Sequence, residues 1–264
     1  MNKLSLGFLC LIVSACAAPR ANPKLGVLPD FDHLPCAESI RAKVGDAECS
    51  RRLTAFVGRG LRATVVLRQA GSTGPVAAGE QAGAGVVIDA AGRVLTAYHV
   101  IRGLNGITAT VREVGGADGR FVYRDARVVP MRVVAFAERP DLALLEPEQP
   151  VEMPEPLPVD PAVRSFRQNY RYWFFPSRPV AYGGAIVSGL TETAVAADGA
   201  ARADLVEMNV PAVAGDQGGP VVSYAGNVVG IMLLENTAKK TAYFIPVSIA
   251  VQLFGLTCVT EVVR

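Results

Sequence analysis

The chain has 264 residues, half of them apolar, and this length is enough to bury the core of one two-lobed domain. Its 26 lysines and arginines nearly balance its 24 aspartates and glutamates, which gives a formal net charge of +2. So small a charge argues against a nucleic-acid-binding surface, and we expect no nucleic-acid partner. A peptide or another protein is the favoured partner.

The first 15 residues have the pattern of a secretory signal peptide. Lys3 precedes an apolar run from Leu4 to Ala15, which is too short to span a bilayer. The run ends in VSAC at Cys16, which resembles the lipobox of bacterial lipoproteins, where the cysteine is diacylated after cleavage. We therefore expect an exported, periplasm-facing lipoprotein of the bacterial cell envelope, anchored to the membrane through Cys16. The alternative is cleavage after Ala17 or Ala18, which would give a secreted protein without the lipid.

Three cysteines remain if Cys10 is removed with the signal peptide and Cys16 is acylated. Cys36, Cys49 and Cys258 would then share an oxidising compartment, where three thiols cannot all pair. The simplest disulfide joins Cys36 to Cys49 and staples a short helix, while a bridge from either residue to Cys258 stays open. A catalytic cysteine is not expected, because none lies near the motifs described below.

Composition divides the chain into three parts. We expect a signal peptide at residues 1–15, a tether with the short stapled helix at residues 16–52, and one β domain at residues 53–258. The tether is rich in proline and lacks periodicity. His33 is isolated within it, so we expect this histidine to be solvated.

Twelve short runs rich in valine and isoleucine begin at about residue 61, separated by glycine, proline and charged turns. The first six are ATVVLR, GAGVVID, RVLTAYHV, ITATVREV, ARVVPMRVVAF and LALLE. After a proline-rich linker, the second six are RYWFF, GGAIVSGL, LVEMNV, GPVVSY, NVVGIMLL and TAYFIPV. This pattern predicts an all-β fold of two six-stranded antiparallel β-barrels. The final segment, SIAVQLFGL, predicts a short C-terminal helix capped by Ser248.

The segment from Tyr170 to Phe175 is aromatic at five of its six positions. Successive side chains of a strand point to opposite faces, so we expect one face of this segment to pack in the core. A substrate-facing aromatic patch is the alternative.

Three motifs carry the residues of chemical interest. His99 lies in LTAYHV, Asp141 begins the apolar run of RPDLALL, and Gln217 lies in GDQGGP. In this order the motifs resemble those of the trypsin-like serine proteases, especially the bacterial high-temperature-requirement branch, over roughly residues 61–254. The resemblance implies that His99 is the catalytic base and that Asp141 orients its imidazole. A carboxylate entering an apolar strand is also costly unless it is paired, so Asp141 requires a partner on physical grounds.

Gln217 departs from the family, which carries its nucleophilic serine at this place in GDSGGP. A carboxamide cannot replace the hydroxyl, because its nitrogen lone pair is delocalised and its longer side chain fills the space of the scissile bond. Loss of the serine costs such a unit about a millionfold in turnover. The resemblance further implies that the amides of Gly215 and Gln217 form an oxyanion hole. Clusters of histidine and cysteine are absent from the sequence, so we expect no metal and no other cofactor.

We therefore expect a pseudoprotease that binds an extended peptide or a protein through the cleft. Two alternatives stay open. One is an active serine-type endopeptidase rescued by an unrecognised route, such as water activated by His99. The other is a cell-envelope scaffold lipoprotein in which the cleft has no role. Ser188 and Ser223 belong to other strands, so neither is expected to replace the nucleophile.

Overall fold

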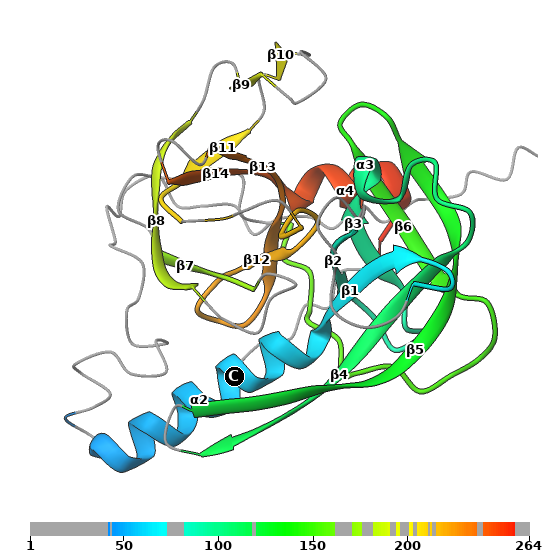
Figure 1. Cartoon of the computed structure of the whole chain (residues 1–264). Helices are drawn as coiled ribbons and strands as arrows, with labels where there is room; N and C mark the ends of the chain where they lie inside the picture. The colour runs from blue at the N-terminus through cyan, green and yellow to red at the C-terminus, as the bar shows by residue number, and fades with distance from the viewer. Residues whose placement is uncertain are drawn as a thin grey trace, which may run out of the picture.

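The structure is a computed structural model that describes residues 42, 44–72, 82–117, 120–161, 171–175, 182–190, 194–195, 201–202, 205–210, 212, 215–236 and 240–256. Within these residues the chain forms two β-barrels, with one long helix against them and a short helix after the last strand (Figure 1). The predictions for Cys16, His33, Cys36 and Cys258 fall outside the described residues.

The first barrel is closed, and each of its strands is antiparallel to both neighbours. In spatial order its strands are β1 (Thr64–Gln69), β2 (Ala82–Val87), β3 (Val94–Ala97), β6 (Leu142–Pro147), β5 (Arg120–Ala137) and β4 (Ile107–Ala117). Valine, leucine and alanine side chains from these strands fill the interior. A single helical turn, α3 (Tyr98–Ile101), follows β3 directly.

The second barrel is closed in the same antiparallel manner. In spatial order its strands are β11 (Val206–Met208), β14 (Thr241–Pro246), β13 (Val228–Asn236), β12 (Pro220–Val222), β7 (Arg171–Phe174) and β8 (Tyr182–Leu190). A separate two-stranded sheet consists of β9 (Ala194–Val195) and β10 (Ala201–Arg202). Each of the twelve barrel strands coincides with one of the twelve predicted runs, so the two-barrel prediction is confirmed.

The predicted C-terminal helix is also present, as α4 (Val247–Phe254). It buries Val247 and Ala250 and ends at Gly255, which adopts the left-handed conformation common after a helix. Ser248 was predicted to cap this helix, and that prediction is wrong. The cap position is occupied by Pro246, which leaves Ser248 inside the first turn, and the cap makes no side-chain hydrogen bond.

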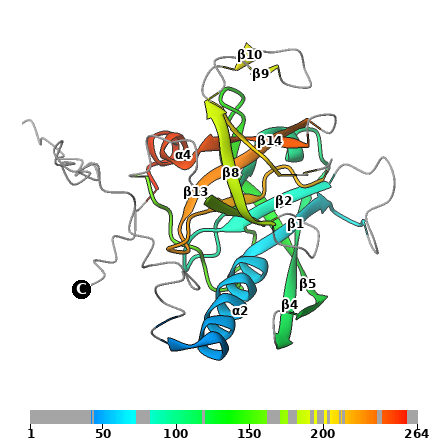
Figure 2. The same ribbon diagram turned by 90° about the vertical axis from the view of Figure 1, so that its left-hand side faces the viewer.

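An 18-residue helix, α2 (Asp46–Ala63), precedes the first barrel and lies beside the long β4–β5 hairpin (Figure 2). The boundary expected between residues 52 and 53 falls inside this helix. Asp46 and Glu48 lie in its first turn, where negative charge stabilises the helix dipole. A hydrogen bond from Arg52 and the charge of Arg51 hold the pKa of the Glu48 carboxyl below its usual value. Cys49, also in α2, is buried and takes part in a disulfide.

The aromatic segment of β7 divides between two environments. Tyr172 and Phe174 point into the second barrel and are almost fully buried. On the opposite face, Trp173 and Phe175 pack against Phe56 of α2, with ring centroids 5.4 and 6.1 Å from that of Phe56. The expectation that one face of this segment packs in the core is therefore confirmed. The other face is covered by a helix that the strand pattern did not reveal.

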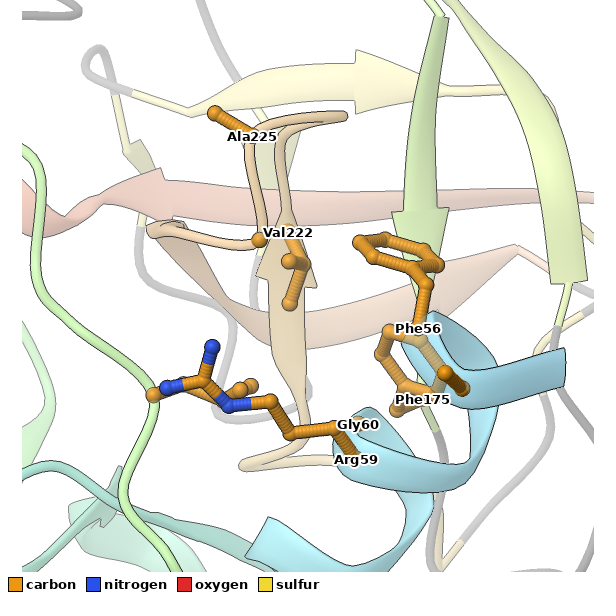
Figure 3. Close-up of a pocket in the computed structure, with 9 residues that line it drawn as sticks. Phe56, Arg59, Gly60, Phe175, Val222 and Ala225 are labelled. Carbon is orange, nitrogen blue, oxygen red and sulfur yellow. The ribbon is translucent and has the colours of Figure 1, made fainter. Parts of the chain in front are cut away.

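Gly60 allows α2 to approach this aromatic cluster. Its position is helical and buried, and a Cβ added there would overlap the ring of Phe175 (Figure 3). Phe175 is itself fully buried, so its ring has little room to move away. The glycine therefore sets the distance between α2 and the second barrel.

We predict that Gly60→Ala destabilises the protein by about 1–3 kcal/mol, because the added methyl overpacks the contact with Phe175. Intrinsic helix propensity predicts the opposite sign, a gain of about 1 kcal/mol from the same change. Urea unfolding measured beside the exposed control Ser50→Ala separates the two effects. An unchanged or raised free energy of unfolding in Gly60→Ala would show that Phe175 does not restrict the helix.

Candidate active site

Asp141 is held in an unusual backbone conformation at the start of β6. Its φ is 74°, in the left-handed region that residues other than glycine rarely adopt. The Asp141 amide donates to the Ala137 carbonyl at 3.0 Å, and the Asp141 carbonyl accepts from the Tyr98 amide at 3.2 Å. These bonds fix the residue on both sides of its Cα. Such outliers persist where the surrounding structure determines them, often at functional sites.

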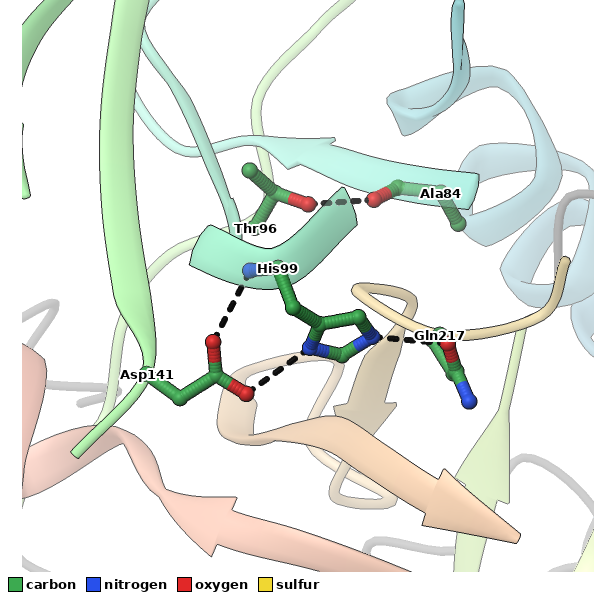
Figure 4. Close-up of polar contacts among 5 residues, drawn as sticks. All are labelled: Ala84, Thr96, His99, Asp141 and Gln217. Atoms are coloured by element: carbon green, nitrogen blue, oxygen red, sulfur yellow. Dashed lines mark hydrogen bonds and ion pairs between the residues drawn. The ribbon is translucent and has the colours of Figure 1, made fainter. Parts of the chain in front are cut away.

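Asp141 is only 4% exposed, and His99 supplies donors to both oxygens of its carboxylate. The backbone amide of His99 donates to Oδ1 at 2.8 Å, and the ring Nδ1 lies 2.8 Å from Oδ2 (Figure 4). His99 lies in α3, at the end of β3, and its side chain is 30% exposed. The partner that the sequence required for Asp141 is therefore His99, which presents its other ring nitrogen away from the carboxylate.

That second nitrogen, Nε2, lies 2.7 Å from the Oε1 atom of Gln217 (Figure 4). An amide oxygen and a carboxylate oxygen are both acceptors, so both ring nitrogens of His99 must carry protons in this arrangement. Turning the Gln217 amide by half a rotation would instead direct its NH₂ group at an unprotonated Nε2. In either case the Gln217 side chain is hydrogen-bonded to Nε2, the nitrogen that would act as the base.

The turn that carries Gln217 is fastened to both barrels through its backbone. The Gln217 carbonyl accepts from the Ala84 amide of β2 at 2.7 Å. In β13, Met232 accepts from the Gly218 amide at 2.7 Å and donates to the Gly219 carbonyl at 2.9 Å. The Gln217 turn therefore lies where the barrels meet, opposite His99.

Gly218 is required by this close approach. Its φ is 84°, and a Cβ added there would overlap the Ala84 carbonyl oxygen and the hydroxyl of Thr96. The Thr96 hydroxyl donates to the same Ala84 carbonyl at 2.6 Å. Sequence reasoning did not single out Thr96, although a hydroxyl residue in the otherwise apolar strand VLTA was an available signal. Thr96 therefore holds the Ala84 carbonyl against which Gly218 lies.

Three further residues can now be placed. Gly215, with a φ of 91°, lies in the same turn as Gln217. The oxyanion-hole role of their two amides stays a prediction. Ser223 lies beyond β12, where its hydroxyl accepts a hydrogen bond from the Asn227 amide at 3.4 Å, and Ser188 belongs to β8. The Ser223 hydroxyl thus stabilises the turn between Ser223 and Asn227, and the residue facing His99 is Gln217.

Two antiparallel six-stranded barrels, with a histidine and a buried aspartate facing a glycine-rich turn, define the double-barrel class of serine-protease folds. The family model described as "Trypsin-like peptidase domain" matches residues 83–231, more than half of the sequence, and the chain belongs to this family.

Two known proteins show the extent of the similarity. The curated protein "Protease Do-like 1, chloroplastic" from Arabidopsis thaliana is 27% identical over 154 residues, which cover 56% of this chain and 32% of that protein. The solved structure of a serine endoprotease from Yersinia pestis is similar with a TM-score of 0.55 at 18% identity. That match covers 76% of this chain and 64% of the other. The chain thus spans about a third of its curated relative, and the structural likeness establishes the fold alone.

We predict that both ring nitrogens of His99 are protonated at a pH where His33 is neutral, because Gln217 Oε1 and the Asp141 carboxylate both accept. The chain has only these two histidines, so ¹⁵N NMR of histidine-labelled protein resolves the two rings. In Gln217→Ala the Nε2 proton should be lost, while His33 serves as the internal control. A singly protonated His99 ring in the unaltered protein would mean that the NH₂ group of Gln217 faces Nε2.

Proposed function

We propose that this chain is an exported trypsin-like homologue that binds a peptide or a protein without hydrolysing it. The observation that carries this proposal is the 2.7 Å contact between Gln217 Oε1 and His99 Nε2. In a serine protease, this nitrogen takes the proton from the attacking hydroxyl. Here it faces a carboxamide, which offers no nucleophilic oxygen to the scissile carbonyl.

The loss of turnover expected without the serine is large enough to support inactivity. Removing the serine from a working triad costs about a millionfold in turnover, and the residual rate depends on substrate binding and the oxyanion hole. The Gln217 side chain reaches from its turn to His99 and so fills the space between nucleophile and base. A scissile bond placed there would have to displace this contact.

Retention of His99 and Asp141 has an explanation that does not involve catalysis. The Asp141 carboxylate is buried, and His99 provides donors to both of its oxygens. Removing one partner of a buried, charged pair commonly costs about 3–5 kcal/mol, because the remaining charge is left without compensation. The pair is therefore needed for stability even where no reaction takes place.

Two features support peptide binding. In β13, residues 234–236 pair with β14 on one side, and within the described residues no strand pairs with their other side. An extended peptide could bond to that side by strand addition. Tyr98 also stacks on Phe136 with 4.6 Å between ring centroids, and Phe136 is 53% exposed. This aromatic pair would offer an apolar contact to a side chain of the peptide.

Hydrolysis is the second candidate, because the two similar proteins are named as proteases and the His99–Asp141 pair is intact. In that case a water molecule would replace the nucleophile, with His99 as its base. Such a route requires Gln217 to leave Nε2 and orient the water instead. A scaffold role, with the cleft unused, is the remaining alternative.

We predict that the unaltered chain does not hydrolyse casein or peptides and is not labelled by a fluorophosphonate, whereas Gln217→Ser gains both reactions. The backbone of the turn is already fastened to Ala84 and Met232, so a serine would be presented to His99. Gln217→Ala is the matched control, since it opens the same space without a nucleophile.

Turnover by the unaltered chain that disappears in His99→Ala would overturn the inactive assignment. An inert Gln217→Ser variant that folds normally and binds no peptide would favour the scaffold. Peptide binding by the unaltered chain, measured by fluorescence anisotropy, tests the binding role separately.

Export and lipid anchoring belong to the same proposal and are supported by the apolar run that ends at Cys16. In the described part of the chain, no helix is both long and apolar enough to cross a membrane. A diacylated Cys16 would hold the domain at the membrane surface through the proline-rich tether.

We predict that the full chain, expressed in a Gram-negative bacterium, is recovered in the membrane fraction with an acylated Cys16 detectable by mass spectrometry. Cys16→Ser should move it to the soluble fraction, because the lipid attachment point is lost, while Cys10→Ser should leave it membrane-bound. Soluble protein beginning at residue 18 or 19 would instead identify an ordinary signal peptide.

A further inference from the structure

The turn between α3 and β4 carries the dipeptide Asn105–Gly106, and no other asparagine in the sequence is followed by glycine. Both residues are exposed to solvent. Among the described residues, no hydrogen bond is found for the Asn105 side chain or for the Gly106 amide. The Gly106 carbonyl is fixed, since it accepts from the Ala70 amide at 3.2 Å. The dipeptide thus lies in an ordered turn whose reactive groups are open to water.

Gly106 is required at this position by the fold. Its φ is 78°, in the left-handed region that residues other than glycine rarely adopt. A Cβ added there would also lie only 2.9 Å from the Cβ of Ala70. The turn therefore needs glycine at residue 106, and a glycine has no side chain to shield its own amide nitrogen. Asn105 accordingly precedes the least hindered amide that a peptide chain offers.

An asparagine can react with the amide of the residue that follows it, and asparagine is one of the thermolabile residues. The Gly106 nitrogen loses its proton to base and forms a bond to Cγ of Asn105, while the bond from Cγ to the side-chain nitrogen breaks and ammonia leaves. The product is a five-membered succinimide ring. Water then opens this ring at either carbonyl, giving aspartate or isoaspartate. Overall, one water is consumed and one ammonia is released, and neither an oxidant nor a cofactor takes part.

Two other asparagines show what protects such a residue. Asn209 and Asn227 are each followed by valine, whose branched side chain crowds the amide nitrogen. The Val210 amide donates to a carbonyl at 3.0 Å, and the Val228 amide donates to another at 2.7 Å. These amides are therefore unavailable for attack. Asn209 is exposed like Asn105, so exposure alone does not distinguish the two.

We propose that Asn105 is a site of spontaneous deamidation, at which the folded chain converts the carboxamide to aspartate and isoaspartate. Folding protects a group when hydrogen bonds or packing must open before it can react, and neither restrains this side chain or the amide that attacks it. Both products add one negative charge. Isoaspartate also lengthens the main chain by one carbon, in the segment that joins α3, which carries His99, to β4.

The test follows each asparagine by peptide mapping and mass spectrometry of the full chain at mildly alkaline pH, beside the same chain unfolded in guanidinium chloride. Asn105 in the folded chain should react within about tenfold of the rate in the unfolded chain, because no hydrogen bond has to open first. In ¹⁸O-labelled water the product should carry the label at residue 105, and an isoaspartyl methyltransferase should detect isoaspartate there. Asn209 and Asn227 are the internal controls and should stay unchanged in the folded chain.

The matched variant is Asn105→Gln, which keeps an exposed carboxamide but would have to form a less favourable six-membered ring. It should abolish the reaction at this position, and an equal rate in this variant would show direct hydrolysis without a ring and overturn the proposal. Asn105 that stays unchanged in the folded chain, while the unfolded chain reacts, would show that the turn protects it.

A further measurement separates the native turn from opened chain. Denaturant added below the unfolding transition should leave the rate at Asn105 unchanged. A rate that rises with this denaturant would place the reaction in partly unfolded molecules and overturn the proposal. None of these results bears on hydrolysis of peptides or on the contact of Gln217 with His99, so they are separate from the outcome for the proposed function.

Discussion

The arrangement of the site depends on the buried carboxylate of Asp141. A charged group with almost no exposure to water must be compensated within the protein, and His99 compensates it twice, through its backbone amide and its ring. Because one of these donors is backbone, the position of α3 and the orientation of the imidazole are set together. The bonds from Asp141 to Ala137 and Tyr98 then tie β6 to both neighbouring segments. The His99–Asp141 pair is thus a structural joint, and it does not require a nucleophile in order to persist.

The backbone and the side chain of residue 217 have separate tasks. The Gln217 carbonyl binds the Ala84 amide and so joins its turn to the first barrel, while the side chain points to His99. Gly218, which has no side chain, allows the backbone of this turn to lie close to the Ala84 carbonyl. A change of side chain at residue 217 therefore leaves the joint between the barrels unchanged and alters only what faces the imidazole. This separation explains how a glutamine can stand in a glycine-rich turn whose neighbours keep the pattern of an active enzyme.

Sequence alone predicted the barrels well, because each strand carries its own signal in alternating β-branched residues bounded by turns. It also identified His99, Asp141 and Gln217, which lie in short motifs. It missed the full extent of α2, although Leu53, Phe56 and Leu61 follow helical spacing, because two glycines and a run of charged residues interrupt the pattern. The motifs allowed a hydrogen bond between Gln217 and His99, but its geometry could not be predicted, since it depends on segments that are distant in sequence. The 2.7 Å contact joins residues 118 positions apart.

Phe175 shows how such distant segments act on one another. Its ring contacts α2 at Gly60, which no larger residue could replace without displacing the ring. Its backbone amide donates to the Pro220 carbonyl at 3.2 Å, and its own carbonyl leaves no room for a side chain at Gly219. Phe175 therefore lies between α2 and the glycines that follow Gln217. A shift of α2 that moved Phe175 would bring its carbonyl closer to the backbone of Gly219. Gly219 has no side chain that could change its rotamer to make room. The position of the helix and the shape of the Gln217 turn are therefore set by the same packing.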